Sequence, residues 1–210
     1  MSLSASELSN LKHAPAVDGV LPVFHHRWSP RAFSPRAVSK QDLRRVFEAA
    51  RWAASSNNEQ PWRYIVGLRG SQTHEKIFAS LMGFNQSWAG KAPVLILGLA
   101  KAKFGHNGSP NLFAFYDLGA ASSYLTLQAA ALGLATHQMA GVDREKARSL
   151  FEIPADYEIG AAIALGYQDE PETLGNEELI KRELAPRHRK PLEEIVFSAW
   201  GEPLDLNGGQ

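Results

Sequence analysis

The sequence predicts an α+β fold in which helices surround a central sheet. Short β-rich runs alternate with helix-like segments, one of these runs is continuously apolar, and one long segment rich in Ala and Leu is apolar on nearly every side. The chain has 210 residues, of which 44% are hydrophobic, so it can bury a full core. We expect one domain over residues 1–210, with a helical arm at 1–20 and an extended arm at 186–210.

The elements follow in order along the chain. A short helix over residues 4–12 begins at Ser4, and a stronger helix runs from a Ser39 cap to about residue 54. Further along we expect a strand at 62–68, a helix at 73–82, and a strand at 94–100 that is covered on both faces. A mobile loop at 101–111 then leads to a long buried helix at 112–132, which packs against a second long helix. The last two strands, at 134–139 and 159–166, flank a helix capped by Asp143.

Composition excludes several kinds of function. The chain has no cysteine, which rules out disulfides and thiolate catalysis, so any redox chemistry must come from a bound cofactor. Its formal net charge is +0, which argues against nucleic acid as a partner. The start of the chain has no apolar signal core, and no stretch approaches the roughly 18 apolar residues of a membrane span, so we expect no membrane and a cytoplasmic location. The seven histidines show no metal-ligand spacing, and we expect no metal.

A basic segment near the start of the chain, RWSPRAF at residues 27–33, is typical of a phosphate site. Arginine donates bidentately to phosphate oxygens, and Arg27 and Arg31 bracket Ser29 at a spacing that brings all three to one anion. A second basic cluster, RHRK, stands at residues 187–190. The alternative is that both are solvated loops.

Motifs for other chemistry are missing. No strand is followed by G-x-G-x-x-G, and the chain has neither a phosphate-binding G-x-x-x-x-G-K-[ST] loop nor a hydrolase G-x-S-x-G elbow. The polar stretch AASSNNEQPW at 53–62 follows a predicted helix. By itself this stretch is explained as a loop that satisfies the last helical carbonyls.

Five stretches together resemble the FMN-dependent nitroreductase family, from about residue 24 to residue 202. In order they are RWSPRAF, AARWAASSNNEQPWRYIVG, AALGL followed by MAGVD, ALGYQDEP, and RHRKPLEEIVFSAWG. The resemblance implies a nitroreductase-like sandwich with a central, mostly antiparallel sheet flanked by helices. It also implies an intertwined homodimer whose two FMN sites lie between the chains.

The resemblance assigns site residues by position. Arg27 and Ser29, with Trp28 in the same motif, would hold the FMN phosphate together with Arg187 and Arg189 from the tail. Arg31 would lie near the flavin N1 and C2 carbonyl. The remaining positions are Ser55, Ser56 and Asn58 from the neighbouring subunit, Asn85 at the pyrimidine edge, and Met139, Ala140 and Gly141 with backbone N–H groups near flavin N5.

The implied function is an FMN-dependent oxidoreductase. It would take hydride from NADH or NADPH at flavin N5 and reduce a nitroaromatic, quinone or similar flat acceptor by a ping-pong mechanism, with no catalytic side chain. Ala54, Asn57 and Ala140 depart from residues common in the family, which leaves substrate choice open. The alternatives are reductive dehalogenation or oxygen-dependent flavin chemistry on the same fold, a flavin-binding dimer without activity, and a plain phosphate-binding or nucleic-acid module.

Overall fold

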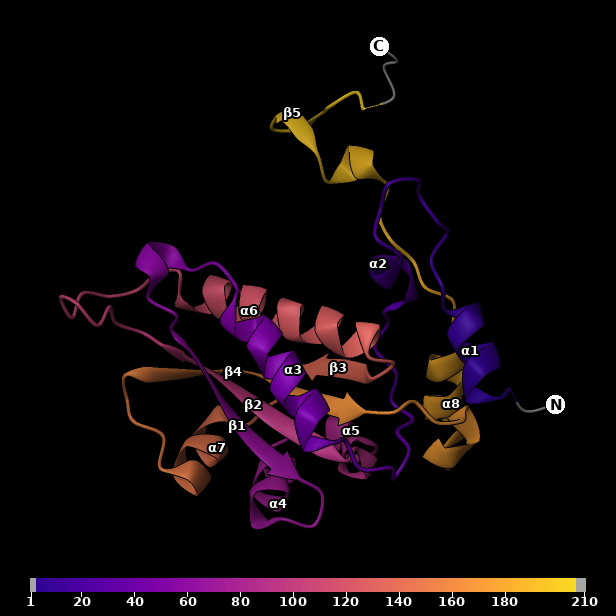
Figure 1. Ribbon diagram of the computed structural model, residues 1–210, viewed down its shortest axis with the longest axis horizontal. Helices are drawn as coiled ribbons and strands as arrows, with labels where there is room; N and C mark the ends of the chain where they lie inside the picture. The colour runs from indigo at the N-terminus through magenta and orange to yellow at the C-terminus, as the bar shows by residue number, and fades with distance from the viewer. Residues whose placement is uncertain (1–2, 207–210) are drawn as a thin grey trace.

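A four-stranded antiparallel sheet lies at the centre of the computed structural model, which describes residues 3–206 (Figure 1). Its strands are β1 (Trp62–Leu68), β2 (Val94–Lys101), β3 (Ala135–Met139) and β4 (Tyr157–Gly166), in the order β1-β2-β4-β3. Every neighbouring pair in this sheet is antiparallel. The four predicted strands are therefore confirmed, and so are the α+β class and the antiparallel arrangement that the resemblance implied.

Helices cover both faces of the sheet. Val94, Ile96 and Ala100 of β2 pack in the core under α3 (Lys40–Arg51) and α6 (Ala114–Ala131). The alternate residues of the strand, Leu95, Leu97 and Leu99, pack in a second core under α4 (Gln72–Ala79) and α7 (Arg144–Phe151). Because both of its faces are buried, β2 has the continuously apolar sequence that predicted a central strand.

The predicted helix starts are confirmed by their caps. Ser4 forms a capping box with Glu7 at the start of α1 (Ala5–Leu11), and the side chains of Ser39 and Asp143 accept backbone N–H groups at the starts of α3 and α7. Two helix ends were predicted too late: α3 ends at Arg51 and α4 at Ala79. After α4 the chain turns back toward β3, where the N–H of Met82 donates to the carbonyl of Gly141.

The long helix α6 is buried on one face only, so the expectation of burial on nearly every side is wrong for a single chain. Leu118 and Leu125 pack on the sheet, whereas Tyr116 is 77% exposed and Gly119 is also exposed. The second long helix against which α6 packs is α3 of the same chain. Its remaining face is apolar and uncovered.

Two segments outside the sheet complete the chain. The helix α1 lies beside α8 (Glu177–Leu184), and the segments before α2 (Pro22–His26) and after α8 rise away from the body (Figure 1). The tail, predicted to be an extended arm, contains a short turn at Leu192–Glu194 and a hairpin of β5 (Phe197–Ala199) and β6 (Glu202–Pro203). Within residues 3–206 no helix combines the length and apolar character that crossing a membrane requires.

Candidate functional site

The first basic segment leaves α2 and crosses the end of the sheet. The chain becomes extended at Arg27, whose Nη1 lies 3.3 Å from Ser29 Oγ as a hydrogen-bond donor. Both side chains are half-buried. The structure therefore brings together the guanidinium and the hydroxyl that the sequence singled out for a phosphate.

The two distant basic clusters meet here. Burial lowers the pKa of Arg27 below its usual value, and the positive charges of Arg187 and Arg189 lower it further, which places both tail arginines within electrostatic reach of Arg27. Among residues 3–206 no carboxylate lies within ion-pair distance of any of the three. Gathered cations without a carboxylate repel one another, and an anion among them would relieve that repulsion.

The tail arginines differ in how much of their donor capacity is free. Arg187 Nη1 donates to the carbonyl oxygens of Lys12 and His25, at 2.6 and 2.9 Å, and so ties α1, α2 and the tail together. Arg189 is exposed and donates to the carbonyl of the neighbouring His188. Arg189 therefore has more N–H groups available to bind an anion, whereas Arg187 mainly holds the tail against α1 and α2.

Arg31 contacts Glu183 and Phe84, and the shared anion site that its spacing predicts stays a prediction. Its Nη1 lies 3.7 Å from Oε2 of the fully buried Glu183, and its guanidinium lies 5.9 Å from the ring centre of Phe84. The Nε of Arg31 is buried without a hydrogen-bond partner in the described part of the chain. An unpaired buried donor costs free energy, so this N–H group is available to donate a hydrogen bond to an acceptor atom of a ligand.

Trp28 contacts Gln168 and Lys12, and it lines a cavity of about 250 Å³ together with Arg27. Its Nε1 donates to Gln168 Oε1 at 3.1 Å, and Lys12 Nζ lies 4.9 Å from the ring centre. Its indole N–H is therefore already used by Gln168, while its ring remains part of the cavity wall beside Arg27.

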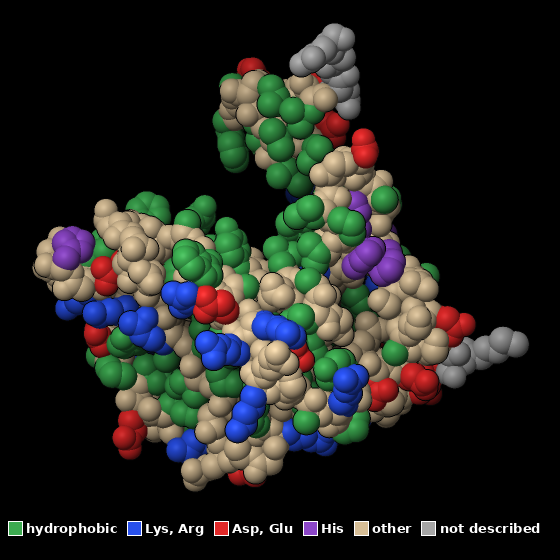
Figure 2. Space-filling view, viewed as in Figure 1, with side chains coloured by type: hydrophobic (Ala, Val, Ile, Leu, Met, Phe, Trp, Pro, Cys, Tyr) green, Lys and Arg blue, Asp and Glu red, His purple; other side chains and the backbone are tan. Residues whose placement is uncertain are grey.

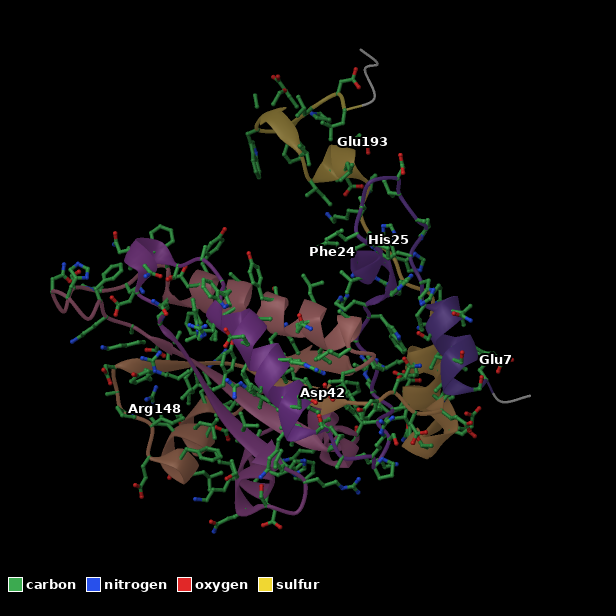
Figure 3. The ribbon with its side chains drawn as sticks, in the orientation of Figure 1. Glu7, Phe24, His25, Asp42, Arg148 and Glu193 are labelled. Atoms are coloured by element: carbon green, nitrogen blue, oxygen red, sulfur yellow. The ribbon has the colours of Figure 1, made fainter. Side chains whose placement is uncertain are left out.

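A cavity of about 270 Å³ opens beside Arg27, between α2, α6 and β3. Figure 3 shows Phe24 projecting from α2 over this region. The opposite wall is formed by α6 and by Gln138 of β3, whose Nε2 donates to Thr126 Oγ1 at 3.1 Å. Hydrophobic side chains also line the hollow between the raised tail and the body (Figure 2). The space next to the cations therefore has mixed apolar and amide walls, which suit a flat, polar-edged ligand.

The segment after β3 carries three of the predicted residues. Met139 is buried and Ala140 is exposed, while the carbonyl of Gly141 accepts hydrogen bonds from Asn85 Nδ2 at 3.1 Å and from Met82 N at 3.0 Å. The structure thus brings Asn85 to the Met139–Gly141 segment, although the two lie 56 positions apart in the chain.

The polar loop with Ser55, Ser56 and Asn58 lies at the other end of α6 (Figure 1). The N–H of Ser56 donates to Oδ2 of the buried Asp117 at 3.1 Å. A further cavity, of about 240 Å³, opens where this loop meets the first turn of α6. From Asp117 to Thr126 the helix rises roughly 14 Å at 1.5 Å per residue, so the loop and the basic group occupy separate halves of α6.

The backbone of this loop is unusual. Asn57, Asn58 and Gln60 all have positive φ angles, between 51 and 53°. Non-glycine residues rarely adopt this left-handed conformation, and Asn tolerates it best. Strained backbone of this kind is concentrated at functional sites, which separates this loop from an ordinary helix end.

Three further residues support the site and were not predicted. Glu183 accepts backbone N–H groups of the basic segment, Asp117 accepts from the polar loop, and His137 bonds to Pro30. The first two carried a visible signal, because each is an acidic residue on the buried face of its helix, Glu183 one turn after the buried Leu179. His137 gave no such signal, since its partner comes from a segment 107 positions away.

Comparison with known proteins decides the family. The nitroreductase family model matches residues 25–84 and 69–167, more than half of the chain. The chain belongs to the nitroreductase family. Its fold agrees, since it resembles a crystal structure described as an oxidoreductase containing FMN, with a TM-score of 0.81 and 32% identity over 88% of this chain and 93% of that one.

The chain is also similar to three further proteins. An uncharacterized 15.4 kDa protein of Mycolicibacterium smegmatis is 36% identical over 68% of this chain and 99% of its own length. A protein of Thermus thermophilus named NADH dehydrogenase is 28% identical over 87% of this chain and 97% of its own. A nitroreductase family structure from Clostridium difficile 630 has a TM-score of 0.62 and 26% identity, covering 82% of this chain and 93% of that one.

Proposed function

We propose that the protein is an FMN-dependent NAD(P)H oxidoreductase that reduces flat acceptors such as nitroaromatics or quinones by a ping-pong mechanism. The observation that carries the proposal is that Arg27, beside Ser29, lies within electrostatic reach of Arg187 and Arg189. These cations come from both ends of a nitroreductase-family chain, and within residues 3–206 no carboxylate forms an ion pair with them. Relatives named for FMN and for NADH support the cofactor and the electron donor.

The residues present fit FMN. Arg27, Ser29 and Arg189 would bind the phosphate, with Arg187 holding the tail in place. The unpartnered buried Nε of Arg31 provides a donor for a carbonyl of the pyrimidine ring, which Asn85 and the Met139–Gly141 segment would approach from β3. The mixed walls of the cavity beside Arg27 suit part of such a ligand.

When bound, FMN supplies the redox chemistry, accepting hydride at N5 and passing electrons on to the acceptor. The chain's own contribution is to bind and orient the cofactor and the substrates and to exclude water from the site. Arg31 places positive charge where the flavin becomes more negative on reduction, which favours the reduced form. We assign no side chain as a catalytic acid or base.

The complete site would need two chains. The basic group and the strained loop lie on separate halves of α6, and the face of α6 between them is apolar and exposed around Tyr116 and Gly119. A second copy packed antiparallel on this face would cover it and bring its own Ser55, Ser56 and Asn58 to the first copy's basic group. Two equivalent sites would result.

The test is to purify the protein and record its visible spectrum before and after adding FMN. We expect a yellow protein that oxidises NADH or NADPH when a simple quinone is supplied, with parallel double-reciprocal lines when both substrates are varied. A folded protein that stays colourless after incubation with excess FMN contradicts the proposal. Oxidation of NAD(P)H only in the presence of oxygen would favour the oxygen-dependent alternative.

A further inference from the structure

A carboxylate lies fully buried behind the basic segment. Glu183 has 0% exposure on α8, a helix whose other acidic side chains, Glu177 and Glu178, are exposed. It occupies the position one turn after the buried Leu179, where an apolar residue would be expected. Burying a carboxylate is expensive unless it is fully hydrogen-bonded, so its partners indicate its role.

Those partners belong almost entirely to the segment that carries Arg31. Oε1 accepts the N–H of Arg31 at 2.8 Å and that of Ala32 at 3.1 Å, and Oε2 also accepts from Arg31 N at 3.1 Å. Oε2 lies 3.7 Å from Arg31 Nη1 as well. Glu183 therefore contacts both the backbone and the side-chain cation of a single residue.

The contacts also indicate the charge of Glu183. Its pKa lies above the usual value, because burial raises it by more than the N–H groups of Ala32 and Arg31 and the positive charges of Arg31 and Lys12 lower it. Both oxygens act as acceptors, as an ionised carboxylate requires. Lys12, the other cation, is directed elsewhere, because its Nζ donates to the carbonyl of Ala185 and lies over the ring of Trp28.

We propose that Glu183 is a positioning residue that acts on the cofactor through Arg31, fixing where its guanidinium lies and partly offsetting its positive charge. The bond geometry orients Arg31 so that its Nε remains buried and unpartnered, ready for an acceptor on the bound ring. This inference rests on the proposed FMN function and adds to it a residue that sets the balance between oxidised and reduced cofactor.

The consequence can be measured as a reduction potential. A flavin becomes more negative on reduction, so a nearby cation favours the reduced form and a carboxylate beside that cation weakens the effect. Glu183→Gln keeps the size and one acceptor oxygen but removes the charge. The midpoint potential of the bound FMN should rise, and the preference for reduced over oxidised FMN should increase about tenfold, the size of effect that one neighbouring charge has on a titrating group.

The experiment uses FMN-loaded protein and a reference dye. The wild type, Glu183→Gln, Arg31→Gln and the double variant are compared, with Glu177→Gln as the matched control, because Glu177 is an exposed glutamate at the start of the same helix. We expect no change in the control and a higher potential in Glu183→Gln. In the Arg31→Gln background, Glu183→Gln should change the potential much less, because the guanidinium through which Glu183 acts is absent.

The outcomes separate this inference from the proposed function. If the wild type binds no FMN, the proposed function fails. If the wild type binds FMN and Glu183→Gln has an unchanged potential, or shifts it equally with and without Arg31, the positioning role is wrong. Should circular dichroism show that Glu183→Gln is unfolded, Glu183→Asp replaces it, because it keeps the charge and draws the carboxylate back from the Arg31 side chain. A potential that shifts in Glu183→Asp but not in the same variant carrying Arg31→Gln supports the inference, and an unchanged potential overturns it.

Discussion

His137 and Pro30 join the sheet to the basic segment through one hydrogen bond. The ring Nδ1 of His137 lies 3.0 Å from the carbonyl oxygen of Pro30, and because a carbonyl only accepts, the ring nitrogen is the donor. The ring also packs against buried Trp88, with centroids 4.6 Å apart. Burial first, and then the charge of Arg31, lower the pKa of His137 from its usual 6.5 to about 4.

We predict that acid weakens the fold through this histidine. The pKa is lower in the folded chain, so the unfolded chain binds more protons between pH 6.5 and about 4, and the stabilisation present above pH 6.5 is lost progressively as the pH falls through that window. The loss should be about 2 to 3 kcal/mol at most. Urea unfolding of wild type and His137→Gln at pH 7 and pH 4.5 checks it: the variant should lose less stability on acidification, and equal losses would contradict the assignment.

Arg27→Ala should lower flavin retention by about tenfold or more, because a charge-assisted hydrogen bond contributes about 1.5 to 3 kcal/mol. The measurement is the FMN content per chain after purification, followed by a fluorescence titration with added FMN. Arg45→Ala is the control, since Arg45 is exposed on α3 and forms its ion pair with Asp42 on its own helix. A full flavin spectrum in Arg27→Ala would count against the phosphate site.

If two copies pair through α6 as proposed, Gly119→Glu should separate them without unfolding either one. A Cβ at Gly119 meets no atom within 4 Å in the single chain, and glutamate is a better helix former than glycine. A charged side chain on the exposed face of α6 would nevertheless block a second copy. We expect a monomer by light scattering that keeps its helical circular dichroism and loses FMN, and a flavin-loaded dimer would refute the interface on α6.

Gly67→Ala should destabilise the fold by roughly 1 to 3 kcal/mol, the usual cost of overpacking. Here α4 crosses β1 so closely that a Cβ would lie 2.4 Å from His74 N and 2.5 Å from His74 Cα, and backbone cannot move aside as a flexible side chain can. Gly83→Ala, where a Cβ meets nothing within 4 Å, should leave the melting temperature nearly unchanged. Thermal unfolding of both variants tests the contrast.

Local patterns predicted much of this architecture. The strand at 62–68 was predicted with its observed bounds, because β-rich sequence and burial agree there, and the caps Ser39 and Asp143 marked helix starts correctly. The short helices α2 and α5 were missed, since four or five residues carry too little periodicity. The tail hairpin was missed for a similar reason, as its two strands span only three and two residues.

The site was harder to predict, because its geometry depends on partners far apart in sequence. Arg27 and Ser29 are two positions apart, and their pairing could be anticipated. The orientation of the Arg31 side chain could not be anticipated, because it is set by the carboxylate of Glu183, 152 positions away. Spacing alone cannot show which of several nearby cations a buried acid will attract.

The predicted FMN-binding residues lie at two separate halves of α6, so two differently inactivated variants should complement each other. A chain carrying Arg27→Ala still has an intact Ser55–Asn58 loop, and a chain defective in that loop still has its basic group. Mixed together, two such inactive proteins would form hybrid assemblies in which one of the two sites draws only wild-type residues. Partly restored turnover on mixing two inactive variants, neither of which is active alone, would be the signature of shared sites.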